Sequence, residues 1–109
     1  MFAKYVSKGF LTPIDGIKMK TSVYGENSLL TRFHLTKGSS LPRHSHPQEQ
    51  TGFMVSGKMK LFIDGEGFIA EPGDTWSIKG DIEHWAEVIE DSVAIEVFSP
   101  LREDYLPIP

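Results

Sequence analysis

Apolar and polar residues alternate along much of the chain with the two-residue period of a β-strand. The segment IKMKTSVYG (17–25) alternates apolar or β-branched residues with lysines and a serine. In LLTRFHLT (29–36), three large apolar side chains fall on one parity, and Arg32 and His34 fall on the other. Successive side chains of a strand point to opposite faces, so both segments predict strands with one buried face, and His34 is expected to point outward.

Pairs of turn-forming residues separate several further short apolar segments. These pairs are Ser56-Gly57, Asp64-Gly65, Pro72-Gly73 and Gly80-Asp81. The segment HWAEVIEDSVAIEVFSP (84–100) reads as two strands joined near Glu90, Asp91 and Ser92. Many short strands at near-regular spacing are typical of an all-β protein, and we expect a jelly-roll β-barrel. The length of 109 residues suits a single domain that covers 1–109.

The composition narrows the range of possible functions. The net charge is -4 and no basic patch is present, so we expect no nucleic-acid partner. Cysteine is absent, so any metal would be bound by nitrogen and oxygen donors. The first ten residues lack the apolar region of a signal peptide, and no apolar run is long enough to cross a bilayer. We therefore expect a cytoplasmic protein that does not associate with a membrane.

Two of the 4 histidines lie one residue apart in HSHPQEQ (44–50). If one strand continues through this segment, His44, His46 and Gln50 share a face, whereas Glu49 points the other way. Neutral imidazole is the commonest protein metal ligand, a carboxamide oxygen could be a third donor, and a distant histidine could be the fourth. Histidines in a loop, hydrogen-bonded to water, explain a lone H-x-H pattern equally well.

The wider spacing around these histidines resembles the first motif of the cupin family. Five residues separate Gly38 from the H-x-H pair, three separate that pair from Gln50, and six separate Gln50 from Gly57. Gln50 stands in the place of the usual glutamate.

The second cupin motif is matched less closely. Counting from Gly73, His84 stands at the position of the metal-binding histidine, but Lys79 replaces the usual proline and Asp81 the usual glycine. The resemblance implies a jelly-roll barrel that holds a divalent transition metal, such as zinc, nickel, iron or manganese. The implied metal ligands are His44, His46, Gln50 and His84.

Glu96 is an acid inside the apolar run VAIEVF (93–98). From the pattern alone, a surface position on a half-exposed strand is slightly favoured, because burial of an unpaired carboxylate is costly. Glu96 and Phe98 share one face, so they would reach the same cavity, and Arg102 could fold back over its mouth.

The segments HSHPQEQTGFMVSGK (44–58) and VFSPLRED (97–104) resemble the pectin- and alginate-degradation cupins. Members of this family convert the unsaturated uronates released by polysaccharide lyases and glycuronyl hydrolases into linear 4-deoxy-5-keto uronates. The resemblance implies an enzyme that acts on a small sugar acid. It implies catalytic roles for Glu96 and Arg102 and substrate contacts for Phe98 and Arg102, although the family acid is an aspartate.

Two other functions fit the same metal ligands. Another small metallocupin enzyme, such as a dioxygenase or an isomerase, would not need Arg102. A non-catalytic sugar-binding cupin would bind its ligand without turnover. The apolar residues Phe2, Tyr5 and Val6, together with the tail LREDYLPIP (101–109), predict a homodimer.

Overall fold

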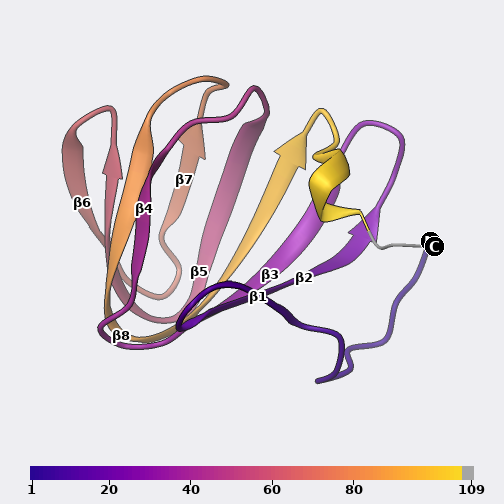
Figure 1. Cartoon of the computed structure of the whole chain (residues 1–109), viewed down its shortest axis with the longest axis horizontal. Coiled ribbons are helices and arrows are strands. Elements are labelled where there is room, and N and C mark those ends of the chain that lie inside the picture. Colours follow the sequence, from indigo (N-terminus) through magenta and orange to yellow (C-terminus); the bar gives the residue numbers. More distant parts are fainter. Residues whose placement is uncertain (107–109) are drawn as a thin grey trace.

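The computed structural model describes residues 1–106, which form an antiparallel β-barrel followed by one short helical turn (Figure 1). The elements are β1 (Leu11–Ile14), β2 (Ile17–Tyr24), β3 (Leu29–Leu35), β4 (Ser40–His44), β5 (Glu49–Ile63), β6 (Glu66–Ala70), β7 (Thr75–Ile78), β8 (His84–Ser99) and the 3-10 turn η1 (Glu103–Tyr105). Within this part of the chain, no helix is long and apolar enough to cross a membrane.

Two long central strands, β5 and β8, organise the barrel. They pair with each other along most of their lengths, and each pairs with different strands in its two halves. The first half of β8 pairs with β4 and the second half with β3, while β5 pairs first with β7 and then with β6. The strands thus form two facing sheets that share a bent central pair, which confirms the predicted jelly roll.

The two central strands bend where the sequence predicts interruptions. The predicted turn at Ser56-Gly57 and the predicted strand junction at 90–92 are both wrong, because β5 and β8 run through these positions. The pairing register shifts there, which is the mark of a β-bulge. Gly57 has φ of 89°, and a Cβ on it would lie 2.3 Å from the Asp91 carbonyl oxygen. A bulge and a chain reversal both favour glycine at positive φ, so the pattern alone does not distinguish them.

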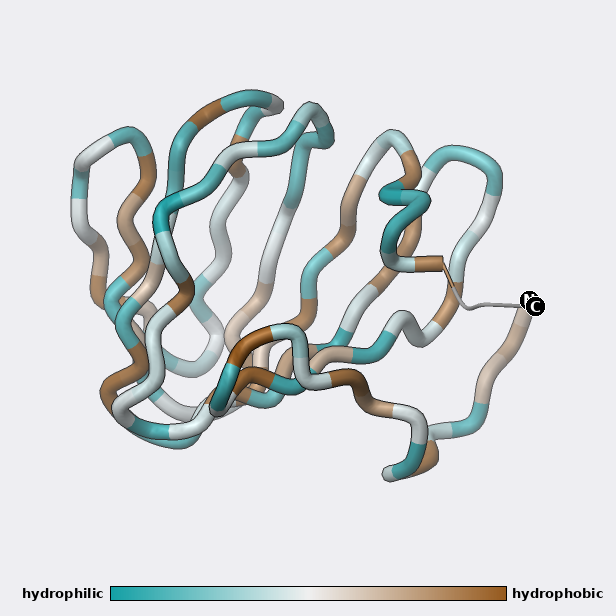
Figure 2. Tube along the Cα trace, in the orientation of Figure 1, coloured by the Kyte–Doolittle hydropathy of each residue, from teal (hydrophilic) through white to brown (hydrophobic). Residues whose placement is uncertain are grey.

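The other turns and the alternation that the sequence predicts are confirmed. The remaining three predicted turns are present, and β3 alternates strictly between buried and partly buried positions. Figure 2 shows the corresponding alternation of brown and teal stretches along the strands. The alternating side chains build one core between the sheets. Its members are Ile17, Met19, Leu29, Phe33, Leu35, Met54, Met59, Leu61, Ala70, Ala86, Val88, Ala94 and Phe98.

The tail packs on the barrel through Leu101, Tyr105 and Leu106. Residues 107–109 of the tail lie outside the described part of the chain. His34 occupies a partly buried position on the outer parity of β3, where its ring lies 4.6 Å from that of Phe10.

Candidate metal centre and active site

Three histidines meet at the junction of β4, β8 and the loop before β5. One ligand nitrogen from each of His44, His46 and His84 lies within 4.8 Å of the other two. His44 ends β4 and His84 begins β8, and the two are directly paired. The prediction that one strand continues from His44 to Gln50 is wrong, because residues 45–48 leave the sheet. Pro47 accounts for this break, since proline has no N–H to donate to a neighbouring strand.

Gln50 nevertheless reaches the histidines from the second position of β5. Its side chain is buried, whereas the neighbouring Glu49 is exposed, as predicted. The turn before His84 is present although Lys79 and Asp81 replace the proline and glycine usual in the second cupin motif. Asp81 has φ of 65°, in the left-handed region that aspartate tolerates better than most residues. Its N–H donates to the His46 carbonyl oxygen at 2.7 Å and so ties the turn to the histidine loop.

Each of the three imidazoles donates its Nδ1–H to a main-chain carbonyl two residues away. The pairs are His44 with Pro42 at 2.7 Å, His46 with Gln48 at 2.9 Å and His84 with Ile82 at 2.8 Å. A carbonyl oxygen only accepts, so each neutral ring carries its lone pair on Nε2. Burial lowers the pKa of His84 from 6.5 to about 4, and burial followed by the charge of Arg102 lowers the pKa of His46. Both rings are therefore neutral at pH 7 and ready to bind a metal.

The donor atoms fit a divalent transition metal. Nε2 of His84 is buried and has no hydrogen-bond partner among residues 1–106. Nε2 of His46 lies 2.7 Å from Oε1 of Gln50, and the Gln50 amide nitrogen donates to Glu96 Oε2 at 2.8 Å. His46 Nε2 and Gln50 Oε1 thus face each other with lone pairs, an arrangement that a nearby cation would stabilise. Three imidazoles and one carboxamide oxygen suit zinc, nickel, iron or manganese.

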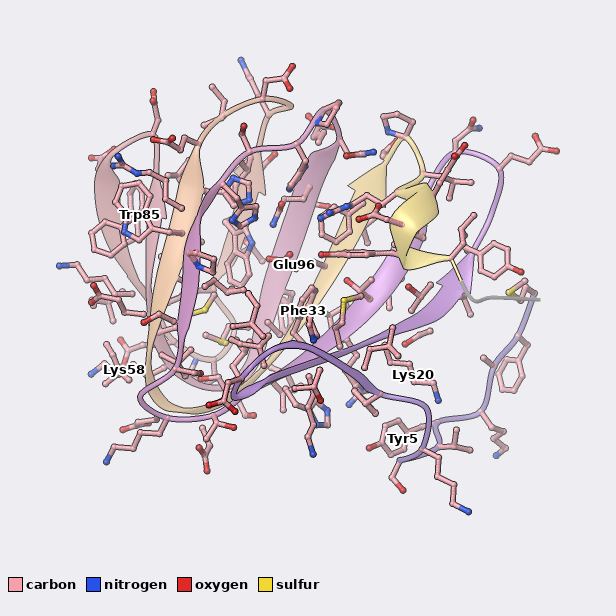
Figure 3. The ribbon with its side chains drawn as sticks, in the orientation of Figure 1. Tyr5, Lys20, Phe33, Lys58, Trp85 and Glu96 are labelled. Atoms are coloured by element: carbon pink, nitrogen blue, oxygen red, sulfur yellow. The ribbon has the colours of Figure 1, made fainter. Side chains whose placement is uncertain are left out.

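Glu96 lies inside the barrel, between the two sheets and near Phe33 (Figure 3). The surface position that the sequence pattern slightly favours is therefore wrong. Oε1 of Glu96 accepts from the Trp76 indole nitrogen at 2.9 Å, and Oε2 accepts from Gln50. Burial raises the pKa of Glu96 from 4.5 to about 7 and outweighs these two hydrogen bonds and the charge of Arg102. Near neutral pH the side chain can therefore take up or release a proton.

Arg102 follows β8 and folds back next to the histidines. Its guanidinium carbon lies 3.8 Å from the centre of the Tyr105 ring and 5.1 Å from that of Phe98. Nη2 of Arg102 contacts Asp104 Oδ2 at 2.9 Å. The Phe98 ring is buried and lies 5.6 Å from the His46 ring. A single positive charge and an aromatic wall therefore stand beside the histidine cluster.

One cavity brings the predicted residues together. Its polar lining is His44, Gln50, His84, Glu96 and Arg102, and its apolar lining includes Phe33, Leu35, Leu41, Phe98 and Tyr105. His46 is joined to this lining through its contact with Gln50. Residues from four distant segments thus face one space in which a metal, a carboxylate and a cation can act on the same small molecule.

Three residues of the site are absent from the sequence prediction. Asp104 and Tyr105 contact Arg102, and their closeness to it in the sequence is the feature that could have identified them as site residues. Trp76 lies 20 residues before its partner Glu96, and its short segment carries no pattern that connects the two. Trp85 is also among the residues that line the cavity, but its ring points away from Glu96 and stacks on Phe62 at 4.8 Å (Figure 3).

Comparison with known proteins agrees with this geometry. Residues 31–99 match the family model described as "Cupin domain". The pectin degradation protein KdgF of Dickeya dadantii is 31% identical over 94 residues, which are 84% of this chain and 86% of that protein.

Solved structures extend the similarity to almost the whole chain. KdgF from a Halomonas species has a TM-score of 0.91 and 26% identity, with 97% of this chain and 100% of that chain covered. An RmlC-like cupin from Shewanella frigidimarina, at 20% identity and a TM-score of 0.90, shares the fold over 97% of this chain and 96% of its own. The chain therefore belongs to the cupin family, as a small cupin similar to the pectin degradation proteins.

Proposed function

We propose that this cupin converts 4,5-unsaturated uronates from polysaccharide breakdown into linear 4-deoxy-5-keto uronates. The observation that carries the proposal is one cavity lined by the histidine cluster, Gln50, Glu96 and Arg102. The similarity to a protein named for pectin degradation supports the same substrate class.

The reaction needs a proton carrier and a binding site for a carboxylate, but no covalent nucleophile. An unsaturated uronate is a cyclic hemiacetal whose ring oxygen is attached to a vinyl carbon. When the hemiacetal opens, its hydroxyl loses a proton and the ring oxygen leaves as an enolate. The enolate becomes a ketone once carbon four gains that proton, so the overall reaction is an isomerisation. The absence of cysteine from the chain is consistent with this chemistry.

His44, His46, Gln50 and His84 would hold the metal. When bound, a divalent cation would act as a Lewis acid toward the oxygens of the substrate. Zinc, nickel, iron and manganese all accept these donors, so the identity of the metal is open to direct measurement.

Glu96 and Arg102 take the other two tasks. Glu96, with a pKa of about 7, would receive the hydroxyl proton and return a proton to carbon four. Nε and Nη2 of Arg102 already contact Asp104, so we assign the substrate carboxylate to the Nη1 side. Phe98 would provide an apolar wall for the face of the sugar.

The test is to incubate the metal-loaded protein with unsaturated galacturonate or mannuronate. Loss of the enol-ether absorbance together with the proton NMR signals of the linear product would support the function. The metal-free protein is the control. A reaction that stops without dioxygen would indicate an oxygenase, and tight binding without product would indicate a sugar-binding cupin.

We also propose that the protein is a homodimer located in the cytoplasm. The dimer is supported by large apolar side chains in the N-terminal segment, where Phe2 is 85%, Tyr5 60% and Val6 51% exposed. Light scattering coupled to size-exclusion chromatography tests the dimer, and a monomer at micromolar concentration would contradict it.

A further inference from the structure

The Trp76 side chain reaches Glu96 across an intervening strand. β5 lies between β7 and β8, and Gly52 of β5 is paired with Trp76 on one side and with Glu96 on the other. The indole Nε1–H of Trp76 donates to Glu96 Oε1 at 2.9 Å. The indole ring therefore lies over Gly52 on the inner face of the barrel and connects β7 to β8.

Gly52 makes this crossing possible because it has no side chain. A Cβ at Gly52 would lie 2.1 to 2.4 Å from three atoms of the Trp76 ring. Carbon atoms that are not bonded pack at about 3.5 to 4.0 Å, so any other residue at this position would displace the ring. The glycine is required for this close approach and not for an unusual backbone angle.

The two hydrogen bonds fix the Glu96 carboxyl group in one plane. Trp76 of β7 donates to one oxygen, and Gln50 of the neighbouring strand β5 donates to the other. A glutamate side chain has several rotatable bonds, so its carboxyl group needs restraint to be held in one place. The indole N–H supplies a restraint that is independent of the metal ligands.

We propose that Trp76 is a positioning residue for Glu96 and that Gly52 keeps the space through which it acts. The indole N–H holds the carboxyl group where it exchanges a proton with the substrate. This inference rests on the proposed function, because it assigns Glu96 the proton transfer.

The kinetic test compares Trp76→Phe with Trp85→Phe in the zinc-loaded protein. Trp76→Phe keeps an aromatic ring above Gly52 but removes the N–H, and Trp85→Phe makes the same change in a ring that points away from Glu96. Loss of a hydrogen bond to a charged group lowers a rate roughly ten- to a hundredfold when the bond acts in the transition state. We therefore expect kcat of Trp76→Phe to fall by about that factor. KM and zinc content should stay near the wild-type values, and Trp85→Phe should match the wild type.

A spectroscopic test does not depend on turnover. The chain has 2 tryptophans, so the ¹⁵N-labelled zinc protein should give two indole N–H signals, and Trp76→Phe assigns them. Replacement of Glu96 by glutamine should move the Trp76 signal and leave the Trp85 signal in place. Gly52→Ala should also move the Trp76 signal and lower kcat as Trp76→Phe does.

The outcomes separate this inference from the proposed function. An unchanged Trp76 signal in Glu96→Gln would overturn the inference, as would equal activity in the two phenylalanine variants or loss of zinc from Trp76→Phe. If the wild type does not convert the uronates, the proposed function fails. The indole signals then still decide whether Trp76 holds Glu96.

Discussion

Replacement of Glu96 by glutamine tests the hydrogen-bond network that joins the proton carrier to the metal centre. The carboxylate accepts from two donors, the Trp76 indole and the Gln50 amide. The introduced carboxamide has nearly the same shape but only one acceptor oxygen. Its NH₂ group must therefore face one of the two donors, and a buried donor without an acceptor costs about 1 to 3 kcal/mol.

The chain can avoid this cost by rotating the Gln50 carboxamide through half a turn. Gln50 Oε1 would then accept from the introduced NH₂, and the Gln50 NH₂ would donate to His46 Nε2, which now lies 2.7 Å from the oxygen. The metal would lose its carboxamide ligand. We expect metal affinity to fall on the order of 10- to 100-fold, as for loss of a group that orients a ligand. Turnover should fall by about 10² to 10⁴, since the proton carrier is lost as well.

Zinc titration in competition with a chromogenic chelator measures the first effect, and the uronate assay measures the second. Glu87→Gln is the matched control, because Glu87 is an exposed acid on the same strand. Glu96→Asp retains two acceptor oxygens and should keep the Gln50 amide in its present orientation if the shorter side chain still reaches it. Wild-type zinc affinity and turnover in Glu96→Gln would refute the reasoning.

Three further changes test other parts of the site. His84→Ala removes a buried ligand nitrogen, and we expect metal affinity to weaken by more than about a hundredfold; an unchanged metal content on elemental analysis would contradict the assignment. Arg102→Ala should keep the metal but raise KM for the uronate about tenfold or more, through loss of a charge-assisted contact, while Arg32→Ala on the outer face serves as the control. In metal-free protein, the folded-state pKa of Glu96 is raised from 4.5 to about 7, so its contribution to stability is present below pH 4.5 and is lost by the time the pH passes 7. Urea unfolding at pH 5 and pH 8 measures the free energy of unfolding of Glu96→Gln and of the wild type. From pH 5 to pH 8, this free energy should rise in the variant, relative to the wild type, by up to about 3 kcal/mol. A difference between the two proteins that does not depend on pH would argue against a buried carboxyl group.

Local pattern predicted the strands well because alternation and burial are properties of neighbouring residues. The strict alternation of β3 follows directly from its sequence. The bends of β5 and β8 did not follow, because Gly57 and Ser92 are typical of turns yet here lie against each other in the interior of two long strands. Ser92 Oγ accepts from the Lys58 N–H at 3.0 Å across this bend. Only the pairing of strands that are distant in sequence shows that the chain bends without reversing.

In the site, too, some features follow from neighbouring residues and others depend on strands that are distant in the sequence. The spacing in the sequence predicted the positions of His44, His46 and Gln50, although the strand assumed to join them is interrupted by a loop. The interior position of Glu96 was not evident, because the donors that compensate for its burial come from β5 and β7. Burial is costly for an unpaired acid, whereas the folded chain supplies two hydrogen-bond donors to Glu96.

The identities of Gln50 and Glu96 explain each other. A glutamate in place of Gln50 would put a negative charge about 3 Å from that of Glu96, as judged from the 2.8 Å contact. At an effective dielectric constant near 20, two such charges repel by roughly 6 kcal/mol, so one of the two acids would remain protonated. A carboxamide removes this conflict, because its oxygen faces the metal ligands while its nitrogen donates to Glu96. The glutamine thus allows an acid next to the metal centre to ionise near neutral pH, which is the property that a proton carrier at this position requires.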